Sequence, residues 1–241
     1  MCFSFIYTEK TVTIVKESDL LMTEIKQEKD KYYVKPINSI INDQYIIPGL
    51  NGKEVDVDKS YEIIKKVGKY SPNLLVYKDI KPELSILNNY DKYIISGNQN
   101  KKEVTLIFKG KKIDNIINIL ETNNITSSFL IDNNQNIQNL INTKHIIIDN
   151  NKNIKQKTKY CYTEQDNNDL LKKCSKQKKY TIKPSIITNK NPFIEIKNNL
   201  KNGSIISLEI NQKLEKELPI IIKYINSKGY IITNLEEFIK E

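Results

Sequence analysis

The feature that most constrains the fold is a strand–helix–strand unit in the middle of the chain. Val104–Phe108 is a run of apolar, largely β-forming residues and predicts a buried strand. Apolar residues at helical spacing then predict an amphipathic helix over Lys112–Asn123, and a second strand follows at Thr126–Ile131. Catalytic and ligand groups usually lie at the carboxyl end of such a strand. Here that position holds Lys109 and Gly110, so the expected chemistry is missing from an enzyme-like arrangement.

The same alternation of strands and helices continues to the end of the chain and predicts an α/β fold with βα units. The residues before it instead show short β-type runs, strong turn signals and one helix near Asp58–Val67, which indicate a small α+β module. A polar, glycine-containing segment at Ser96–Lys102 separates the two patterns. We therefore predict an N-terminal module over residues 1–98 and a second domain over 99–241. Further strands are expected near His145–Asp149, Lys159–Tyr162, Tyr180–Lys183, Ser204–Ile210 and Tyr230–Thr233, and further helices near Asn134–Asn142, Asp166–Lys176, Asn191–Lys201, Leu214–Ser227 and Asn234–Lys240.

The charge and hydropathy of the chain exclude some classes of function. The net charge is +9, but every basic residue is a lysine and the lysines are scattered among acids and asparagines. Without the planar fork of arginine, this pattern predicts no specific nucleic-acid partner. No apolar run approaches the roughly 18–20 residues that span a membrane. Met1–Tyr7 is apolar and has two interpretations: an N-terminal strand or loose end, or the remnant of a membrane anchor that begins upstream.

The three cysteines, Cys2, Cys161 and Cys174, have neither the spacing of a zinc site nor that of a disulfide framework. We expect Cys161 and Cys174 to be buried separately as small apolar residues. A bridge between them is the alternative, for which the sequence offers no support. The redox compartment therefore stays undetermined.

Few residues combine into a catalytic pattern. His145 is the only histidine, so a site with two histidine ligands is excluded, and a structural role is expected for it. No Walker loop, GxGxxG motif or nucleophile elbow is present. Asp132, Asp149 and Glu209 fall at predicted strand ends and, with Lys109, define a candidate cleft. Strand-end acids are also common on solvated surfaces, which is the competing interpretation.

Several segments together resemble the polysaccharide deacetylase family, also called NodB-homology proteins or carbohydrate esterase family four. Asn124–Leu130 is similar to the Ala-Thr-Phe-Phe strand that follows the first helix of that family. Gly203–Leu208 resembles its Gly-Ser-Ile-Ile-Leu-Leu-His strand, and Ile47–Asp56 looks like the N-terminal part of divergent Firmicutes members. The resemblance covers most of the chain and implies a distorted (β/α) barrel preceded by the small α+β module.

The catalytic positions that the resemblance implies all depart from the family pattern. Lys109 and Gly110 stand where the family has its pair of aspartates, and Glu209 replaces the catalytic histidine of the last strand. The metal-binding His-x-x-x-His would fall near Asn150 and Ile154, and the Arg-Pro-Pro-Tyr-Gly loop near Cys161–Glu164, in a chain without arginine. The resemblance thus implies no catalytic residues, no metal site and loss of the family's metal, usually zinc.

These departures predict a catalytically inactive, deacetylase-like protein of the bacterial cell envelope rather than an enzyme. Its partner would be a cell-wall glycan or an envelope protein, with the membrane reached only through an anchor missing before Met1. The location would be extracytoplasmic, membrane-associated or at the cell surface, but cytoplasmic if Met1 is the true start. Two alternatives stay open: an active carbohydrate hydrolase of the deacetylase type with a rebuilt site at Asp132, Asp149 and Glu209, and a structural protein-interaction module.

Overall fold

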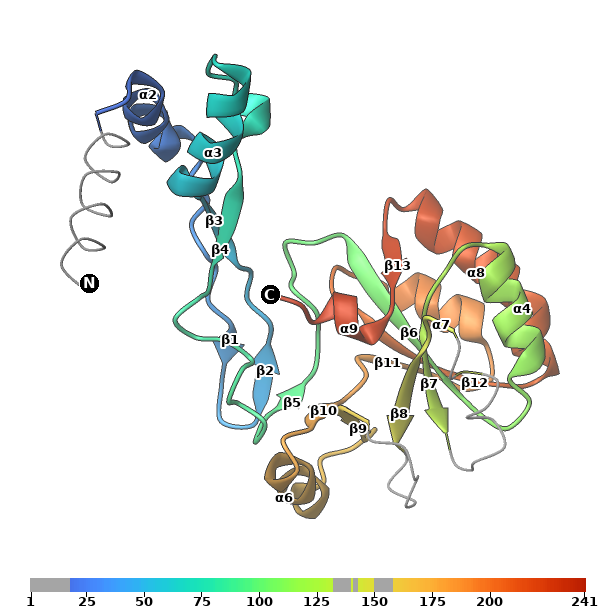
Figure 1. The fold of residues 1–241 in the computed structure, drawn as a ribbon. Helices are drawn as coiled ribbons and strands as arrows, with labels where there is room; N and C mark the ends of the chain where they lie inside the picture. The colour runs from blue at the N-terminus through green and yellow to red at the C-terminus, as the bar shows by residue number, and fades with distance from the viewer. Residues whose placement is uncertain (1–17, 132–139, 141–142, 150–157) are drawn as a thin grey trace, which may run out of the picture. The chain divides into compact units, whose positions relative to one another are not determined.

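The computed structural model describes residues 18–131, 140, 143–149 and 158–241, which form two compact units (Figure 1). The smaller unit contains the residues up to Ile37 together with Asn51–Pro82, and the larger contains Asn38–Leu50 and Glu83–Glu241. This division differs from the predicted boundary at residues 98 and 99. The reason is non-local pairing, because short strands from residues 38–50 and 83–98 hydrogen-bond to the sheet of the larger unit.

The smaller unit contains two α-helices that pack against each other and an antiparallel pair of strands, in agreement with the predicted α+β composition. Asp56 accepts a hydrogen bond from the backbone N–H of Lys59 and caps the helix that the sequence predicted near Asp58–Val67. Val55, Tyr61 and Ile64 are buried in its core. Its elements are α2 (Leu20–Glu28), η1 (Lys29–Tyr32), β3 (Gly52–Val55), α3 (Val57–Val67), η2 (Pro72–Leu74) and β4 (Tyr77–Ile80).

The larger unit is built on one sheet whose strands run in the order β1-β2-β5-β10-β9-β8-β7-β6-β12-β11, with β13 paired to β6 beside β7. All pairs are parallel except β1 with β2. The strands are β1 (Ile40–Ile41), β2 (Tyr45–Ile47), β5 (Tyr93–Ile94), β6 (Glu103–Lys109), β7 (Ser128–Ile131), β8 (Ile146–Asp149), β9 (Tyr160–Tyr162), β10 (Tyr180–Ile182), β11 (Ile186–Thr188), β12 (Ile205–Glu209) and β13 (Ile231–Thr233).

A closed barrel is not confirmed, although the sheet curves strongly. Among the described strands, the recorded pairs form an open path whose two ends, β1 and β11, are not paired with each other. Tyr162 on β9 and Ser207 on β12 lie four strand positions apart, or roughly 19 Å across a flat sheet. Their side-chain oxygens are nevertheless 2.7 Å apart. The sheet therefore curls around the face that carries these residues.

Alternation along the strands divides the apolar residues between two cores. Val104, Leu106 and Phe108 of β6 pack with the helices on the outer face, whereas Ile107 faces the opposite side. That opposite side, which we call the inner face, also contains Ile205 of β12 and residues of the short helix α9. Figure 1 shows α4, α7 and α8 together beside the sheet. The helices are α4 (Asp114–Thr122), α6 (Asn168–Lys176), α7 (Pro192–Asn199), α8 (Gln212–Ser227) and α9 (Leu235–Phe238).

Candidate functional site

The candidate site lies at the carboxyl ends of β6, β9 and β12, on the inner face of the sheet. Lys109 ends β6 two residues after the inward-facing Ile107, and Glu209 ends β12 directly opposite Lys109 in the parallel register. The same two-residue period places Ser207 on this face. Tyr162, the last residue of β9, belongs to the inner core as well. Strand geometry therefore brings these four side chains together from distant parts of the sequence.

Their contacts form one connected polar network. Lys109 donates a hydrogen bond from Nζ to Oε1 of Glu164, and the same Nζ lies 3.4 Å from Oε2 of Glu209. The hydroxyl of Tyr162 donates to Oε1 of Glu164 at 2.8 Å and lies 2.7 Å from Oγ of Ser207. One ammonium group thus contacts two carboxylates, and the local charge of the three ionised side chains is −1.

Burial and hydrogen bonding determine the protonation states of Glu164 and Tyr162 in this network. Burial favours the protonated form of Glu164, but hydrogen bonds from Lys109 and Tyr162 hold its pKa below the usual value. Burial also raises the pKa of Tyr162, so its hydroxyl stays neutral and acts as a donor. The side chain of Lys109 is only 17% exposed. The network is therefore a partly buried ion pair in which Glu164 also accepts a hydrogen bond from the Tyr162 hydroxyl.

This arrangement does not fit a divalent metal. The ammonium group of Lys109 contacts both nearby carboxylates, and its positive charge opposes a second cation there. Within the ranges that the structure describes, no group of three or more His, Cys, Asp or Glu side chains could hold a metal ion. A carboxylate at position 110 would also be strained, because Gly110 has φ +140° and an added Cβ would lie 2.9 Å from Cβ of Ile210.

Of the four predicted cleft residues, the structure describes the side chains of Lys109 and Glu209. Lys109 and Glu209 are in contact, as their positions at neighbouring strand ends predicted. Asp132 lies outside the described residues, and so do Asn150 and Ile154. Asp149 ends β8 and pairs through its backbone register with Ile131 and Cys161; its side chain is outside the description.

The sequence analysis did not select the three residues that complete the network, Tyr162, Glu164 and Ser207. The resemblance had assigned the stretch that contains Tyr162 and Glu164 to the place of the Arg-containing family loop, so it was treated only as a departure. The one available signal was that Glu164 is an acid two residues beyond the predicted strand Lys159–Tyr162, whereas Glu209 was selected as an acid at the end of its own predicted strand.

His145 lies away from this network and has structural contacts. It is 7% exposed, and its Nδ1 accepts a hydrogen bond of 3.1 Å from the backbone N–H of Ser127. Its ring meets that of Phe129 edge to face, with centroids 5.2 Å apart. It also borders a pocket that includes the charged residues Glu121 and Lys144. Because Nδ1 accepts a hydrogen bond, the proton of the neutral ring is on Nε2.

We expect His145 to make stability depend on pH. Burial lowers its pKa below the usual 6.5, an effect that outweighs the opposing charge of Glu121. As pH falls below about 6.5, His145 therefore takes up a proton in the unfolded chain before it does so in the folded protein. The free energy of unfolding is highest above that pH and declines between it and the lowered pKa of the folded protein. Urea unfolding from pH 8 to pH 5 measures this decline.

The matched control is His145→Asn, whose Oδ1 can still accept the hydrogen bond from Ser127 but does not titrate. Because the chain has one histidine, this variant is expected to flatten the decline between pH 7 and pH 5. An identical pH profile for the variant and the wild type would show that His145 is not the group responsible.

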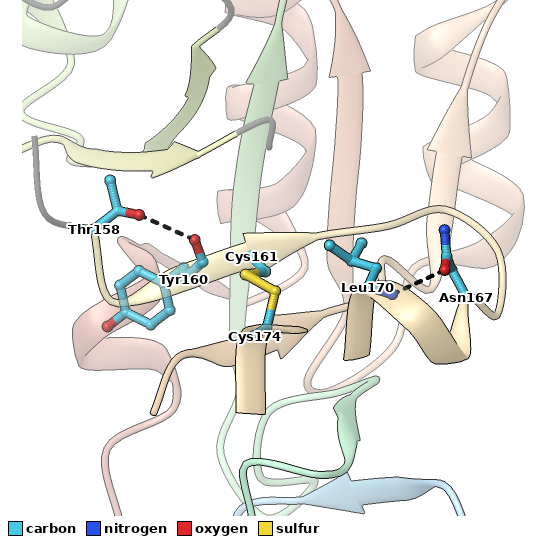
Figure 2. The surroundings of a disulfide bond; sticks show 6 residues. All are labelled: Thr158, Tyr160, Cys161, Asn167, Leu170 and Cys174. Carbon is cyan, nitrogen blue, oxygen red and sulfur yellow. Dashed lines mark hydrogen bonds between the residues drawn. A yellow bond between two sulfur atoms is a disulfide. The ribbon is translucent and has the colours of Figure 1, made fainter. Parts of the chain in front are cut away.

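Cys161 and Cys174 form a disulfide, so the expectation that they are buried separately was wrong (Figure 2). Cys161 is the middle residue of β9 and faces away from the inner core that contains Tyr160 and Tyr162. Cys174 is on the buried side of α6, whose start is capped by Asn167 accepting from the N–H of Leu170 at 3.0 Å. The bond therefore ties α6 to the strand that presents Tyr162.

No helix in the part of the chain that the structure describes has both the length and the apolar character of a membrane span. Met1–Tyr7 and Cys2 lie outside that part.

Comparison with known proteins gives one relative by sequence and several by structure. No protein-family model matches the chain. YlxY, an uncharacterized protein of Bacillus subtilis strain 168, is 30% identical over 129 residues, which are 52% of this chain and 40% of YlxY. The match thus covers less than half the length of that relative.

The structural likeness extends further along the chain. BA3943 of Bacillus anthracis, described as a CE4 family pseudoenzyme, has a TM-score of 0.68 at 18% identity, covering 93% of this chain and 96% of that one. PdaA of Bacillus subtilis, a family 4 carbohydrate esterase, has a TM-score of 0.54 at 15% identity, covering 85% of this chain and 97% of PdaA. The resemblance noted in the sequence is thereby confirmed for the fold: this chain is a divergent protein with the α/β fold of the CE4 polysaccharide deacetylases.

Proposed function

We propose that this chain is a catalytically inactive, deacetylase-like protein. The observation that carries the proposal is the ion-paired Lys109 at the end of β6, in contact with Glu164 and Glu209. The deacetylase mechanism needs a divalent metal to polarise an amide carbonyl and activate water, with one group acting as base and another as acid. Because the ammonium group of Lys109 pairs with both carboxylates, this cluster offers no site for the divalent metal on which that mechanism depends. The pseudoenzyme BA3943 offers a precedent for this fold without its activity.

A calorimetric metal titration tests the absence of a family-type site. We expect titration of the full chain with Zn²⁺, Co²⁺ and Mn²⁺ to give no saturable heat of binding at micromolar metal. An active CE4 enzyme titrated in the same buffer is the positive control. A single saturable site that disappears in the Glu209→Gln variant would contradict the proposal and would favour the alternative of an active hydrolase with a rebuilt carboxylate site.

We further propose that the protein acts at the cell envelope. The disulfide between Cys161 and Cys174 supports this location, because such bonds persist in oxidising compartments and are rare in the reducing cytosol. In cells quenched with acid and then labelled with a thiol reagent in denaturant, Cys161 and Cys174 are expected to be protected as a disulfide. Finding both as free thiols would place the protein in a reducing compartment.

A glycan is the proposed ligand, and Tyr45 is a candidate platform for it. The ring of Tyr45 is partly exposed, its hydroxyl donates to Asp166 at 2.8 Å, and Lys183 donates to the same carboxylate at 2.8 Å. Nζ of Lys183 also lies 4.9 Å from the centre of the Tyr45 ring. An aromatic face beside fixed polar groups is suited to binding a sugar ring and its hydroxyls.

Co-sedimentation with purified peptidoglycan tests the ligand. Binding is expected for the wild type and is expected to be lost in Tyr45→Ala. Tyr33→Ala removes an exposed tyrosine of the smaller unit and serves as the matched control. Absence of binding by the wild type would instead favour the structural protein-interaction module.

A further inference from the structure

A second polar site in the larger unit surrounds the side chain of Glu241. Its Oε1 accepts hydrogen bonds from Oγ of Ser39 at 2.6 Å, from the N–H of Gly49 at 3.0 Å and from the N–H of Ile86 at 3.0 Å. Its Oε2 accepts a hydrogen bond from the hydroxyl of Ser85. Four donors from three separate segments thus converge on one carboxylate, which is the donor pattern of an oxyanion site.

The two hydroxyl donors are oriented by hydrogen bonds that they accept from backbone amides. Oγ of Ser39 accepts from the N–H of Gly49 at 3.0 Å, and Oγ of Ser85 accepts from the N–H of Leu87 at 3.0 Å. Each hydroxyl has an amide donor on one side, so its own proton is directed to the carboxylate on the other. The backbone around them is also fixed, since the N–H of Ser39 donates to the carbonyl of Leu84 at 2.8 Å.

The donors of this site lie close to the points at which the chain passes between the two units. The chain passes between the two units at residues 37/38, 50/51 and 82/83. Ser39, Gly49 and Ser85 each lie within three residues of one of these points, and all belong to the larger unit. The Glu241 carboxylate therefore joins all three segments through which the larger unit is connected to the smaller one.

We propose that Ser39, Gly49, Ser85 and Ile86 form an oxyanion-binding site in which the Glu241 carboxylate is the internal ligand. With Glu241 in place, the site holds together the three segments of the larger unit that contain Ser39, Gly49 and Ser85. When this side chain is removed, the same donors bind a small free carboxylate such as acetate, because the donor geometry is built into the backbone and into two oriented hydroxyls.

Residue-resolved hydrogen exchange of the full chain tests the proposal. In Glu241→Ala, exchange of the Ile86 amide is expected to become about tenfold faster or more, because it loses its carboxylate acceptor. Exchange of the Gly49 amide is expected to rise by a smaller factor, because this N–H keeps Oγ of Ser39 as an acceptor. Amides of β6 are expected to keep their wild-type exchange rates. Glu237→Ala is the matched control, since this glutamate is an exposed acid of α9 that pairs only loosely with Lys240, at 3.6 Å.

Adding acetate separates an oxyanion site from a simple loss of packing. Acetate at about 0.1 M is expected to slow exchange of the Gly49 and Ile86 amides in Glu241→Ala, whereas chloride at equal ionic strength is not. The inference is overturned if acetate has no effect, if the two amides exchange at the wild-type rate, or if exchange rises equally in β6. Should Glu241→Ala fail to fold, Ser85→Ala removes one donor and must accelerate the Ile86 amide in the same direction.

Discussion

Reduction of the disulfide between Cys161 and Cys174 is expected to lower the free energy of unfolding by about 3 kcal/mol. The two residues are separated by 13 positions in the sequence, and closing a loop of roughly this size removes about that much conformational entropy from the unfolded chain. Both cysteines are buried, at 3% and 2% exposed. The bond also anchors α6 to β9, so its loss is expected to loosen the strand end that carries Tyr162.

Urea unfolding with and without reductant measures this effect, and Cys161→Ala/Cys174→Ala reproduces it without reductant. The matched control is Cys2→Ala, which retains the bond and should unfold like the wild type. Titration of thiols in denaturant should find one thiol in three cysteines before reduction and all three afterwards. Finding all three thiols free in protein purified without reductant would contradict the disulfide.

Replacing Lys109 with methionine is expected to lower the free energy of unfolding by about 1–2 kcal/mol. The substitution keeps an apolar stem of similar length but leaves the carboxylates of Glu164 and Glu209 without their shared ammonium partner. The side chain of Lys109 is 17% exposed and that of Glu164 is 36% exposed. The expected loss of stability therefore lies between the values typical of surface and of buried ion pairs. The pKa of Glu164 is expected to rise, since Lys109 is one of the groups that lower it.

A double-mutant cycle isolates the interaction between these two residues. The variant Lys109→Met/Glu164→Gln is expected to be less destabilised than the sum of the single variants, with a coupling of about 1 kcal/mol. Lys213→Met, which breaks the pair with Glu217 on α8, is the matched control and should show no coupling to Glu164→Gln. Strict additivity for Lys109 and Glu164 would mean that their contact does not stabilise the site.

The sequence predicts those residues of the site whose positions follow from strand periodicity. The apolar runs before Lys109 and Glu209 predicted two buried strands, and parallel pairing of those strands brings the two residues together in register. Glu164 could not be found in this way, because β9 lies three positions from β6 in the sheet. Only the curvature of the sheet brings its loop to Lys109, and curvature has no signature in residue spacing.

The disulfide and the boundary between the two units are also determined by contacts between residues far apart in the sequence. Cys174 lies three residues after the buried Leu171 on α6, which places it on the apolar side of that helix. The sequence does not encode that this side faces β9, so separate burial and a bridge were both compatible with the spacing. The boundary predicted at residue 98 relied on local polarity, whereas the pairing of Tyr93 and Ile94 with β10 joins the preceding segment to the larger unit.

We propose that this chain retains the fold of the CE4 deacetylases without their activity, and an acetate-release assay tests this most directly. The full chain is incubated with N-acetylated glycans in the presence of Zn²⁺, Co²⁺ or Mn²⁺, beside an active CE4 enzyme. We predict no acetate above the background without protein, because the positive charge of Lys109, paired with Glu164 and Glu209, opposes binding of the metal that the deacetylase mechanism needs. Metal-dependent release of acetate by the wild-type chain would contradict the claim.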